Sequence, residues 1–286
     1  MDLVCEGEAP SLPEAGSFRP HFGGALANVA VACRRAGVES ALAGGAGDDE
    51  WGRWLREGLE DEGVDLRWFT LVPGVQTPVA FVTFGPEPAF QVYGEGITPA
   101  MQSVAARLAD AVGSAAALAF GSNTLVGESE RALTLEARRL ALERRVPVLF
   151  DPNLRPTRWE RVDQALALCR EICAGALVVR ANRDEATLMT GERDPAAAGD
   201  SLCRLGARLA VVTLGADGAL VRGAAEAHEP GIPTEVVSTL GAGDAFMGAF
   251  AAELARAGWD PAWAGDALTL AVEASAAACR SWEARP

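Results

Sequence analysis

The residues whose types and spacing best suit a chemical reaction lie near the end of the chain, in Ser238-Thr-Leu-Gly-Ala-Gly-Asp-Ala-Phe-Met-Gly-Ala-Phe250. Gly241 and Gly243 permit backbone conformations closed to other residues, and the apolar run from Asp244 to Leu254 predicts a buried helix. The first amides of such a helix have no partner inside it, so with the helix dipole they form a site for phosphate. The same dipole favours the ionised form of Asp244, which can then accept a proton. Taken alone, the pattern equally fits a tight turn followed by a helix-start carboxylate.

Three further polar segments lie at the ends of predicted elements. Gly23 and Gly24 open a second apolar helix, with Asn28 in its first turn. Asp151-Pro-Asn-Leu-Arg155 follows an apolar strand, at the position where α/β sheets bind ligands. Asn182-Arg-Asp-Glu185 follows the next apolar strand. Each segment also has a purely structural interpretation, such as a helix start with a buried asparagine.

The composition excludes several reaction classes. All 25 basic residues are arginine, so a lysine nucleophile, a Schiff base and a Walker-type phosphate lysine are impossible. Two distant histidines and six cysteines without a C-x-x-C pair leave little material for a zinc site or a Ser-His-Asp triad. The net charge of −14, with no basic patch, argues against nucleic acid or a membrane as a partner. No apolar run reaches the roughly 18 residues that span a bilayer, so we expect a cytoplasmic protein with reduced thiols.

The elements that must position these residues repeat one theme, a short apolar strand followed by a helical pattern. Strands are predicted at 115–120, 146–150, 176–179 and 209–214, and helices at 128–145, 161–173 and 184–190. Wholly apolar strands that alternate with helices indicate an α/β fold with a parallel sheet covered on both faces. A short strand is also predicted at Glu235-Val-Val237, directly before the glycine turn.

The region from Gln76 to Gly96 differs from this theme. It predicts two strands, Thr77 to Phe84 and Ala89 to Tyr93, around a turn at Gly85-Pro-Glu-Pro88 with no helix between them. Such a hairpin is typical of a lid or an oligomerisation flap, and a plain surface insertion fits the pattern equally well. With no internal repeat or linker, we expect one main domain with a small β appendage.

The four polar segments, in this order, resemble the ribokinase-type carbohydrate kinases, also called the PfkB family. The family's G-G-x-x-x-N signature matches Gly23, Gly24 and Asn28, and its D-T-T-G-A-G-D-x-F signature matches Gly241, Ala242, Gly243, Asp244 and Phe246. An N-x-x-E motif is matched by Asn182 and Glu185, and V-V-T-x-G-x-x-G by Val211, Val212, Thr213, Gly215 and Gly218. The resemblance covers nearly the whole chain. It implies one ribokinase-like domain over residues 1–286, with three α/β/α layers, a mainly parallel central sheet and a discontinuous β lid at about 11–22 and 73–98.

The resemblance also implies an activity, the transfer of the γ-phosphoryl group of ATP to a sugar hydroxyl. By analogy Asp244 is the base that takes the hydroxyl proton, while the amides of Gly241, Ala242 and Gly243 hold the charge of the phosphoryl group. Phosphoryl transfer needs positioning and charge stabilisation more than a strong base, so an ionised aspartate suffices. Further residues are assigned by the same analogy: Glu185, with Asn182, to Mg²⁺ through water; Asn182, Thr213, Gly215 and Gly218 to the nucleotide; and Asp2, Gly23, Gly24, Asn28, Tyr93, Asn123 and Arg155 to the sugar.

The sugar itself stays open at this point. The segments Asp151-Pro-Asn-Leu-Arg-Pro-Thr-Arg-Trp159 and Ser122-Asn-Thr-Leu125 are similar to those of fructokinases and 2-keto-3-deoxygluconate kinases. In an acid-sugar kinase Arg155 would bind a carboxylate bidentately, whereas with a neutral hexose it would bind hydroxyls or only order its loop.

Three departures from the family pattern are visible. The chain begins Met1-Asp-Leu-Val4, so Asp2 takes the place of the sugar-binding aspartate while the strand expected before it is missing, through a late start codon or a sheet that lacks a strand. Ser238 and Leu240 replace the aspartate and second threonine of D-T-T, and Trp282 stands where glycine is expected. Because that aspartate helps to hold a monovalent cation, activation by K⁺ is doubtful here.

Two other functions were weighed. A dinucleotide-dependent oxidoreductase would need a third glycine at the right spacing, which Gly241-x-Gly243 lacks. A degenerate protein that holds nucleotide or sugar without turnover is the stronger rival, because of the three departures. Many relatives dimerise through their lids, and the apolar side chains of Val79, Phe81, Phe90 and Val92 could support a homodimer here.

Overall fold

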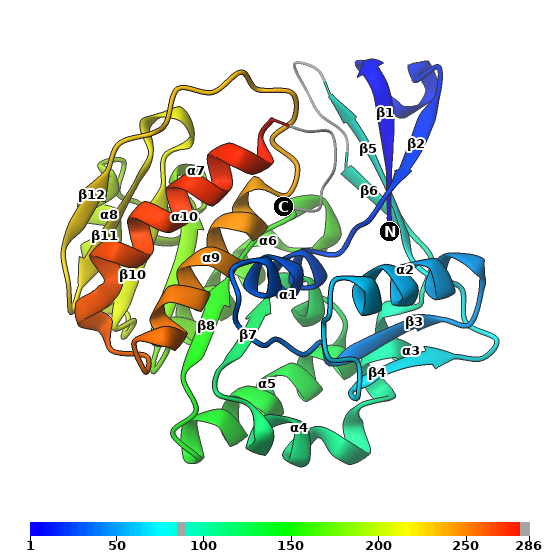
Figure 1. Ribbon diagram of the computed structural model, residues 1–286, viewed down its shortest axis with the longest axis horizontal. Helices are drawn as coiled ribbons and strands as arrows, with labels where there is room; N and C mark the ends of the chain where they lie inside the picture. The colour runs from blue at the N-terminus through cyan, green and yellow to red at the C-terminus, as the bar shows by residue number, and fades with distance from the viewer. Residues whose placement is uncertain (85–89, 281–286) are drawn as a thin grey trace.

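The computed structural model describes residues 1–84 and 90–280 of the chain, and its centre is a six-stranded sheet (Figure 1). The strands lie in the order β12-β11-β10-β9-β8-β7. Their bounds are β7 (Leu118–Gly121), β8 (Val148–Asp151), β9 (Val178–Asn182), β10 (Leu209–Thr213), β11 (Ala219–Gly223) and β12 (Ala227–Glu229). Strands β7 to β10 are parallel, while β11 and β12 are antiparallel to their neighbours. The mainly parallel central sheet predicted from the sequence is therefore confirmed.

The apolar strands bury side chains on both faces of this sheet. In β8, Val148 and Phe150 join one core cluster while Leu149 joins the other. In β10, Ala210 and Val212 alternate with Leu209 and Val211 in the same way. Successive side chains of a strand point to opposite faces, so a strand without polar positions must be covered twice.

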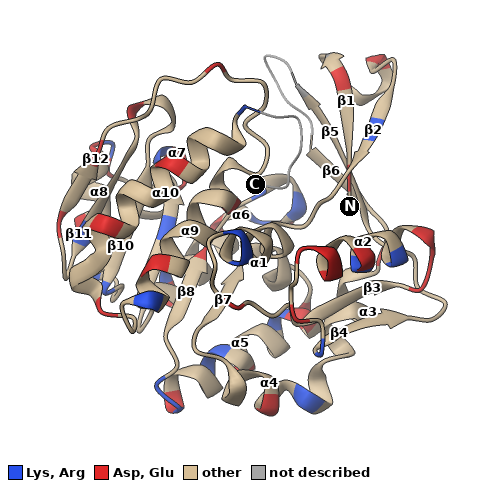
Figure 2. Ribbon diagram, viewed as in Figure 1, with Lys and Arg blue, Asp and Glu red and all other residues tan. Residues whose placement is uncertain are grey.

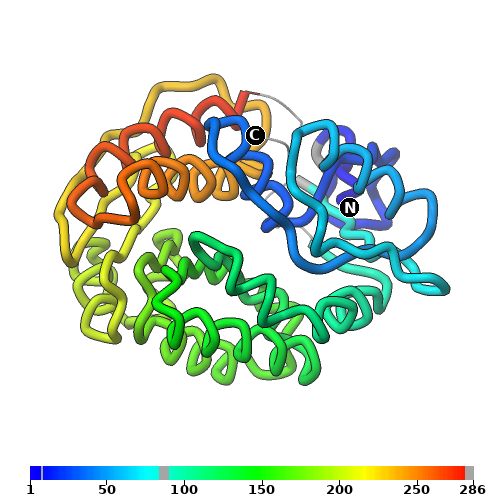
Figure 3. The backbone as a smooth tube through the Cα atoms, turned by 60° about the horizontal axis from the view of Figure 1, so that its bottom comes forward, coloured from blue at the N-terminus to red at the C-terminus, as the bar shows by residue number. Residues whose placement is uncertain are grey.

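Two helical layers provide that cover, and Figure 3 shows them on opposite sides of the sheet. One core cluster holds residues of α5 (Glu128–Glu143), α6 (Val162–Cys173), α7 (Arg183–Thr190) and α8 (Pro195–Arg204). The other holds residues of α1 (Ala25–Arg35), α9 (Ala242–Arg256) and α10 (Ala264–Ala278). The remaining helices are α2 (Glu50–Asp61), α3 (Ile97–Gln102) and α4 (Leu108–Ser114). Together these layers make the α/β/α arrangement that the sequence predicts.

A second sheet of four strands lies beside the main body (Figure 1). Its order is β2-β1-β5-β6, from β1 (Asp2–Glu8), β2 (Phe18–His21), β5 (Val79–Phe84) and β6 (Phe90–Tyr93). The predicted lid ranges, 11–22 and 73–98, contain β2, β5 and β6 but leave out β1. We call these four strands the β appendage, and their action as a lid stays a proposal.

A third sheet contains only β3 (Gly44–Gly47) and β4 (Phe69–Val72), paired in parallel. Among the described residues, β3 has no second strand partner, and β7 pairs only with β8. The strand that the family pattern places ahead of the sugar-binding aspartate is thus not found among the described residues. The segment that begins at Asp2 forms β1 and pairs with β5 in the β appendage instead.

One predicted strand is wrong. Glu235-Val-Val237 forms no strand, because the amides of Val237 and Ser238 donate to the carbonyl oxygen of Cys279 at the end of α10, at 2.8 and 3.2 Å. The backbone hydrogen bonds of this segment therefore go to a helix end rather than to a sheet edge. The predicted turn at Gly85-Pro-Glu-Pro88 and Trp282 lie outside the described residues.

Charged residues of both signs are interspersed over the helices (Figure 2). Helix α2, for example, holds Arg53 and Arg56 among four acidic residues, and Arg56 pairs with Glu60. The part of the chain that the structure describes contains no helix with the length and apolar character needed to cross a membrane.

Close packing between α1 and α9 depends on Gly248, and this dependence can be tested. A Cβ atom at this position would overlap the Cβ of Ala32 and lie 2.8 Å from the carbonyl oxygen of Val29. We expect Gly248→Ala to lower the free energy of unfolding by about 1–3 kcal/mol, the usual cost of overpacking. Urea denaturation measures this change.

The matched control is Gly265→Ala in α10, where the new Cβ would lie 3.9 Å from its nearest neighbour, the Cβ of Ala227. This substitution should be neutral or stabilising by up to about 1 kcal/mol, because alanine is the better helix former. Equal effects of the two substitutions would contradict the packing argument.

Candidate functional site

The carboxyl ends of the parallel strands bring four predicted segments together. Gly121 is in register with Asp151, and Asn182 with Thr213, so the loops after β7, β8, β9 and β10 begin side by side. Arg180 joins two of them, because its guanidinium donates to Asp151 Oδ2 at 3.0 Å and to Thr213 Oγ1 at 2.9 Å. This edge of a parallel sheet is the usual ligand-binding position in α/β folds.

The starts of α1 and α9 meet at the same edge. Asn28, in α1, donates through Nδ2 to Oδ2 of Asp244, in α9, at 2.8 Å. Both side chains are buried, and they are 216 residues apart in the sequence. The other amide atom of Asn28, Oδ1, is buried without a partner among the described residues. An unsatisfied buried acceptor costs free energy, so a donor from water or from a ligand would stabilise it.

Burial governs the acidity of Asp244. It raises the pKa of this carboxyl from 3.8 to about 7, while the Asn28 hydrogen bond and the charges of Arg180 and Arg155 act in the opposite direction. The charge of Asp151 adds to the rise. Desolvation of the charged form therefore opposes the effect expected of the helix dipole, and Asp244 is only partly ionised near neutral pH. A carboxyl with a pKa near 7 is well matched to proton transfer at physiological pH.

The glycine turn before Asp244 has the geometry of an anion site. Gly241 has a left-handed conformation (φ 78°) and precedes the first residue of α9. Among the described residues, the amides of Gly241 and Gly243 have no hydrogen-bond acceptor, whereas that of Ala242 donates to the carbonyl oxygen of Thr239 at 3.3 Å. Of the three predicted amides, two are thus free to bind an anion at the positive end of the helix.

Asp2 approaches the site from the β appendage. It lies against Gly23, where a Cβ atom would be 2.7 Å from the Asp2 amide nitrogen and would overlap its carboxyl group. Gly23 therefore leaves room for Asp2, and Gly24 caps α1 with φ 115°. Burial raises the pKa of Asp2 to about 6, against the lowering effect of the N-terminal ammonium and of Arg155.

Arg155 connects the β8 loop to the β appendage. Its guanidinium carbon lies 4.9 Å from the centre of the Phe90 ring, a cation–π contact. Phe90 is opposite Val82 in the β5–β6 pair, whereas Tyr93 is opposite Val79. Because residues alternate between the two faces of a strand, Phe90 and Tyr93 point to opposite faces. The predicted sugar-binding residue Tyr93 therefore points away from Arg155, and Phe90 is the ring that contacts it.

Asn123 follows β7 in a short 3₁₀ helix (Ser122–Leu125). Its side-chain oxygen accepts a hydrogen bond from Arg158 at 3.0 Å, in the 3₁₀ helix Pro156–Arg158 that follows Arg155. The hydroxyl of the neighbouring Ser122 is buried without a partner among the described residues. The loops after β7 and β8 are thus tied together beside an unsatisfied polar group.

Asn182 and Glu185 form a reciprocal cap at the start of α7. The Asn182 side chain accepts from the Glu185 amide, and Glu185 Oε2 accepts from the Asn182 amide, each at 2.9 Å. Glu185 Oε1 also accepts from the Leu154 amide at 2.7 Å, which fixes the loop that contains Arg155. Burial, with the charge of Asp151, raises the pKa of Glu185.

These contacts limit how a magnesium ion could be held. Among the described residues, no three His, Cys, Asp or Glu side chains cluster as metal ligands. Each oxygen of Glu185 already accepts one backbone hydrogen bond, which leaves one lone pair on each oxygen. The donor set fits a hydrated Mg²⁺ that binds through its water shell, and it does not fit an ion held only by protein ligands.

The predicted nucleotide residues have different structural roles. The Thr213 hydroxyl accepts from Arg180, and a Cβ at Gly215 would meet no atom within 4 Å. Gly218 lies so close to the segment after β12 that a Cβ would overlap the Glu229 carbonyl oxygen and lie 2.5 Å from the Gly231 amide nitrogen. Gly218 is thus required by backbone packing, while Gly215 borders open space.

The predicted cation loop contains Ser238 rather than a carboxylate. Its buried hydroxyl accepts from the Leu240 amide at 3.1 Å, which closes the turn before the glycines. The hydroxyl therefore serves the backbone of the turn.

Two residues of this site were missed in the sequence analysis. Arg180 is a single charge within the apolar strand Val-Val-Arg-Ala, which was a visible signal because an arginine is rarely buried without a partner. Phe90 had no comparable signal, since the sequence does not specify which face of the hairpin meets the main body.

Comparisons with known proteins identify a matching family and similar chains. The profile described as pfkB family carbohydrate kinase matches residues 1–286. The chain is 34% identical to fructokinase-1 of Oryza sativa subsp. japonica over 260 residues, which cover 87% of this chain and 78% of that protein.

Two solved structures are also similar to this chain. One is aminoimidazole riboside kinase from Salmonella enterica complexed with aminoimidazole riboside and an ATP analog, with TM-score 0.83, 31% identity and coverage of 99% of this chain and 92% of that one. The other is fructokinase from Vibrio cholerae O395 in its fructose-, ADP- and calcium-bound form, with TM-score 0.82, 28% identity and coverage of 99% and 91%.

The raised pKa of Asp244 predicts a pH-dependent stability change. The folded protein holds this proton more tightly than the unfolded chain, so the contribution of the carboxyl to stability is full below about pH 4 and is lost as the pH rises through about 7. Asp244→Asn does not titrate here. Its free energy of unfolding, relative to wild type, should therefore rise by up to about 4 kcal/mol between pH 4 and pH 8.

Urea denaturation of both proteins at a series of pH values measures this difference. Asp184→Asn, at an exposed position in the first turn of α7, controls for the change of charge. A constant difference between wild type and Asp244→Asn across the pH range would show that folding does not raise the pKa of Asp244.

Proposed function

This chain belongs to the pfkB family of carbohydrate kinases, and on that premise we propose that it transfers the γ-phosphoryl group of ATP to a hydroxyl of fructose. The observation that carries the proposal is the buried Asn28–Asp244 pair at the glycine turn of α9. It places a proton acceptor and two free amides at one helix start, which suits an alcohol and a phosphoryl group that meet there.

Fructose is proposed because of the fructokinases among the relatives and the polar groups around Asp244. The rice fructokinase is 34% identical to this chain, and the Vibrio enzyme is named as bound to fructose. Asp2, Asn28 and the unsatisfied Ser122 hydroxyl offer neutral or negative partners for sugar hydroxyls. The guanidinium group of Arg155 could bind the carboxylate of an acid sugar bidentately. For this reason 2-keto-3-deoxygluconate is the second candidate.

The proposed reaction uses this chain's residues as follows. The sugar hydroxyl oxygen attacks the γ-phosphorus of ATP, the bond from that phosphorus to the β,γ-bridging oxygen breaks, and ADP leaves. Asp244 takes the hydroxyl proton, which its pKa of about 7 permits. The amides of Gly241 and Gly243 stabilise the charge on the transferring group. Phe90 and Arg155 place the β appendage over the sugar, where closure would exclude water.

A magnesium ion would supply charge neutralisation to the ATP phosphates. Glu185 and Asn182 would hold it through its water shell, because the remaining lone pairs of Glu185 can accept hydrogen bonds from bound water. The same carboxylate orders the loop of Arg155 through the Leu154 amide.

A kinase assay tests the proposal on a panel of fructose, ribose, 2-keto-3-deoxygluconate and nucleosides with Mg-ATP at pH 8, above the pKa of Asp244. We expect the highest kcat/KM on fructose. Asp244→Asn should lower kcat by about 10²–10⁴-fold, the range for loss of a general base. Because Ser238 closes its own turn, we expect equal rates in potassium and choline salts.

The outcomes separate the alternatives. Wild type that binds ATP yet phosphorylates no sugar, with Asp244→Asn equally inactive, would indicate a degenerate binding protein. A preference for 2-keto-3-deoxygluconate would make Arg155 a carboxylate receptor, and Arg155→Gln should then raise the KM for this acid sugar more than that for fructose.

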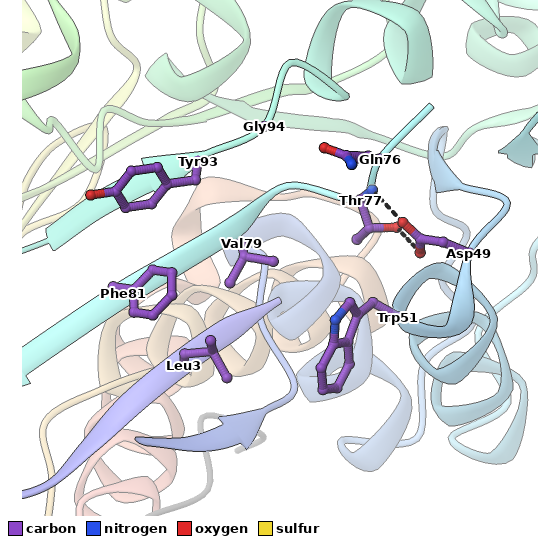
Figure 4. A pocket seen from close by; sticks show the side chains of 9 residues that line it. All are labelled: Leu3, Asp49, Trp51, Gln76, Thr77, Val79, Phe81, Tyr93 and Gly94. Carbon is purple, nitrogen blue, oxygen red and sulfur yellow. Dashed lines mark hydrogen bonds between the residues drawn. The ribbon is translucent and has the colours of Figure 1, made fainter. Parts of the chain in front are cut away.

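A homodimer through the β appendage is the second part of the proposal, and Figure 4 shows the face concerned. Leu3, Val79, Phe81 and Tyr93 lie on this face and border a hollow of about 320 Å³ with Trp51. Phe81 contacts the rings of Phe18 and Tyr93 at centroid distances of 5.2 and 5.4 Å. We call this the outer face, because it lies opposite the one that bears Phe90.

The outer face is apolar yet exposed. Tyr93 is 51% exposed and Trp51 is 40% exposed, while β5 and β6 contain no charged residue (Figure 2). An exposed aromatic group on the uncharged edge strand β6, with a second on the neighbouring helix α2, is a typical interface composition. A second copy of the chain presents the same surface, which a two-fold dimer requires.

Tyr93→Glu tests the dimer by placing a charge on the outer face without filling a buried space. We expect wild type to have the mass of a dimer by light scattering at micromolar concentration, and the variant to dissociate at least tenfold more readily. Leu188→Glu, at a 46% exposed position on α7, is the matched control and should leave the mass unchanged. A monomeric wild type would refute the dimer and leave the proposed kinase activity untouched.

A further inference from the structure

Arg180 is the one buried arginine among residues 1–84 and 90–280. It lies in β9 between Val179 and Ala181, which belong to the core cluster beneath α5 to α8. Strand alternation therefore directs Arg180 to the opposite face, where α9 begins. Arg180 is thus a charge in the middle of a strand whose other buried residues, Val178, Val179 and Ala181, are apolar.

The guanidinium group lies against the anion site of α9. A Cβ atom at Gly243 would be 2.9 Å from both Nη1 and Nη2 of Arg180, so Gly243 leaves room for this group. Asp151 and Thr213 bind the two Nη atoms, and the ring of Phe246 lies 5.9 Å from the guanidinium carbon. Arg180 thus lies between the start of α9, where Asp244 is, and Thr213 at the end of β10.

Two features of this arrangement are unfavourable in the protein without a ligand. A cation beside the first turn of a helix meets the positive end of the helix dipole, which favours negative charge. In addition, Arg180 Nε is buried without a partner among the described residues, a cost of about 1–3 kcal/mol. Asp151 offsets part of the charge through its ion pair at 3.0 Å, but the neighbouring carboxyl, Asp244, is partly protonated near neutral pH.

We propose that Arg180 is a catalytic residue that binds the transferring γ-phosphoryl group beside the amides of Gly241 and Gly243. The inference rests on the proposed function and extends it. As the bond between the γ-phosphorus and the β,γ-bridging oxygen breaks and the bond to the sugar oxygen forms, the three equatorial oxygens of the phosphoryl group keep their negative charge. Arg180 donates to these oxygens, while the hydroxyl proton goes to Asp244 and the leaving charge stays on ADP.

An arginine suits this position for a physical reason. Burial alone would lower its pKa, but the charges of Asp151 and Glu185 outweigh that effect and raise it, so the guanidinium stays protonated. Its planar group binds Asp151 and Thr213 on one side and still has donors for phosphate oxygens. A purely structural ion pair would use the same partners but would not distinguish ATP from ADP.

That distinction provides the test. Wild type, Arg180→Gln and Arg180→Lys are titrated calorimetrically with Mg-ADP and with the Mg complex of β,γ-methylene-ATP, which cannot transfer its terminal group. We expect Arg180→Gln to weaken binding of the ATP analogue by about 10–100-fold, the range for a lost charged hydrogen bond, and that of ADP by less than threefold. Arg180→Lys should lie between wild type and Arg180→Gln.

The kinetic measurement asks whether the substitution changes kcat, KM or both. Arg180→Gln should lower kcat by about 10²–10³-fold, as for removal of an oxyanion donor, with the sugar KM changed less than threefold. The matched control is Arg222→Gln on β11, an arginine that pairs with Asp200 and Glu226 away from the site, and it should behave as wild type. Thermal melts establish that each variant is folded.

Each outcome decides for or against the proposal. Equal weakening of ADP and the ATP analogue by Arg180→Gln, or a kcat within fivefold of wild type, would overturn it and leave Arg180 a structural ion pair. If Arg180→Gln does not fold, Arg180→Lys decides, because it keeps the charge but loses the fork, and selective loss of the ATP analogue is still required. A wild type that phosphorylates no sugar would refute the proposed function, yet the nucleotide titrations would still test Arg180.

Discussion

The hydrogen bond from Asn28 to Asp244 is the interaction on which the site depends. It joins the first turns of two helices that are far apart in the sequence, and it forms only if α1 and α9 pack closely side by side. Gly248 and Ala32 allow that close approach, because a larger side chain at either position would separate the helix axes. The chemistry of Asp244 is therefore set by backbone packing one turn further along α9. The packing of the two helices also buries the carboxyl of Asp244, and this loss of water raises its pKa.

The site balances its charges among buried side chains, Asp151, Arg180, Glu185 and Asp244. Asp151, Glu185 and Asp244 lie within electrostatic reach of Arg180, and the charge of each affects the pKa of this arginine. In the proposed reaction, the phosphoryl group would exchange water for fixed amides and a fixed guanidinium group, with little reorganisation. The unsatisfied atoms of Asn28, Ser122 and Arg180 are a cost of the free protein that bound substrates would remove.

The two faces of the β appendage have different surroundings. The face with Asp2 and Phe90 meets the main body through Gly23 and Arg155. The outer face presents Phe18, Phe81 and Tyr93 to solvent or to a second copy. In the proposed dimer, any movement of the sheet over the sugar would then be transmitted to the partner, because one rigid sheet joins both surfaces.

Sequence alone determined the local features of this protein. Strands without polar alternation must be covered on both faces, so the layers of the fold could be predicted from the sequence. The glycine pairs fixed where α1 and α9 begin, so the segments of the site could be predicted too. Tertiary structure decided the remainder. The face of the hairpin that meets the site placed Phe90, and not Tyr93, against Arg155. Burial raised the pKa of Asp244. The amides of Val237 and Ser238 bonded to a helix end and not to a sheet. These outcomes depend on neighbours that are distant in the sequence, and a local pattern contains no information about desolvation or about which face a strand presents.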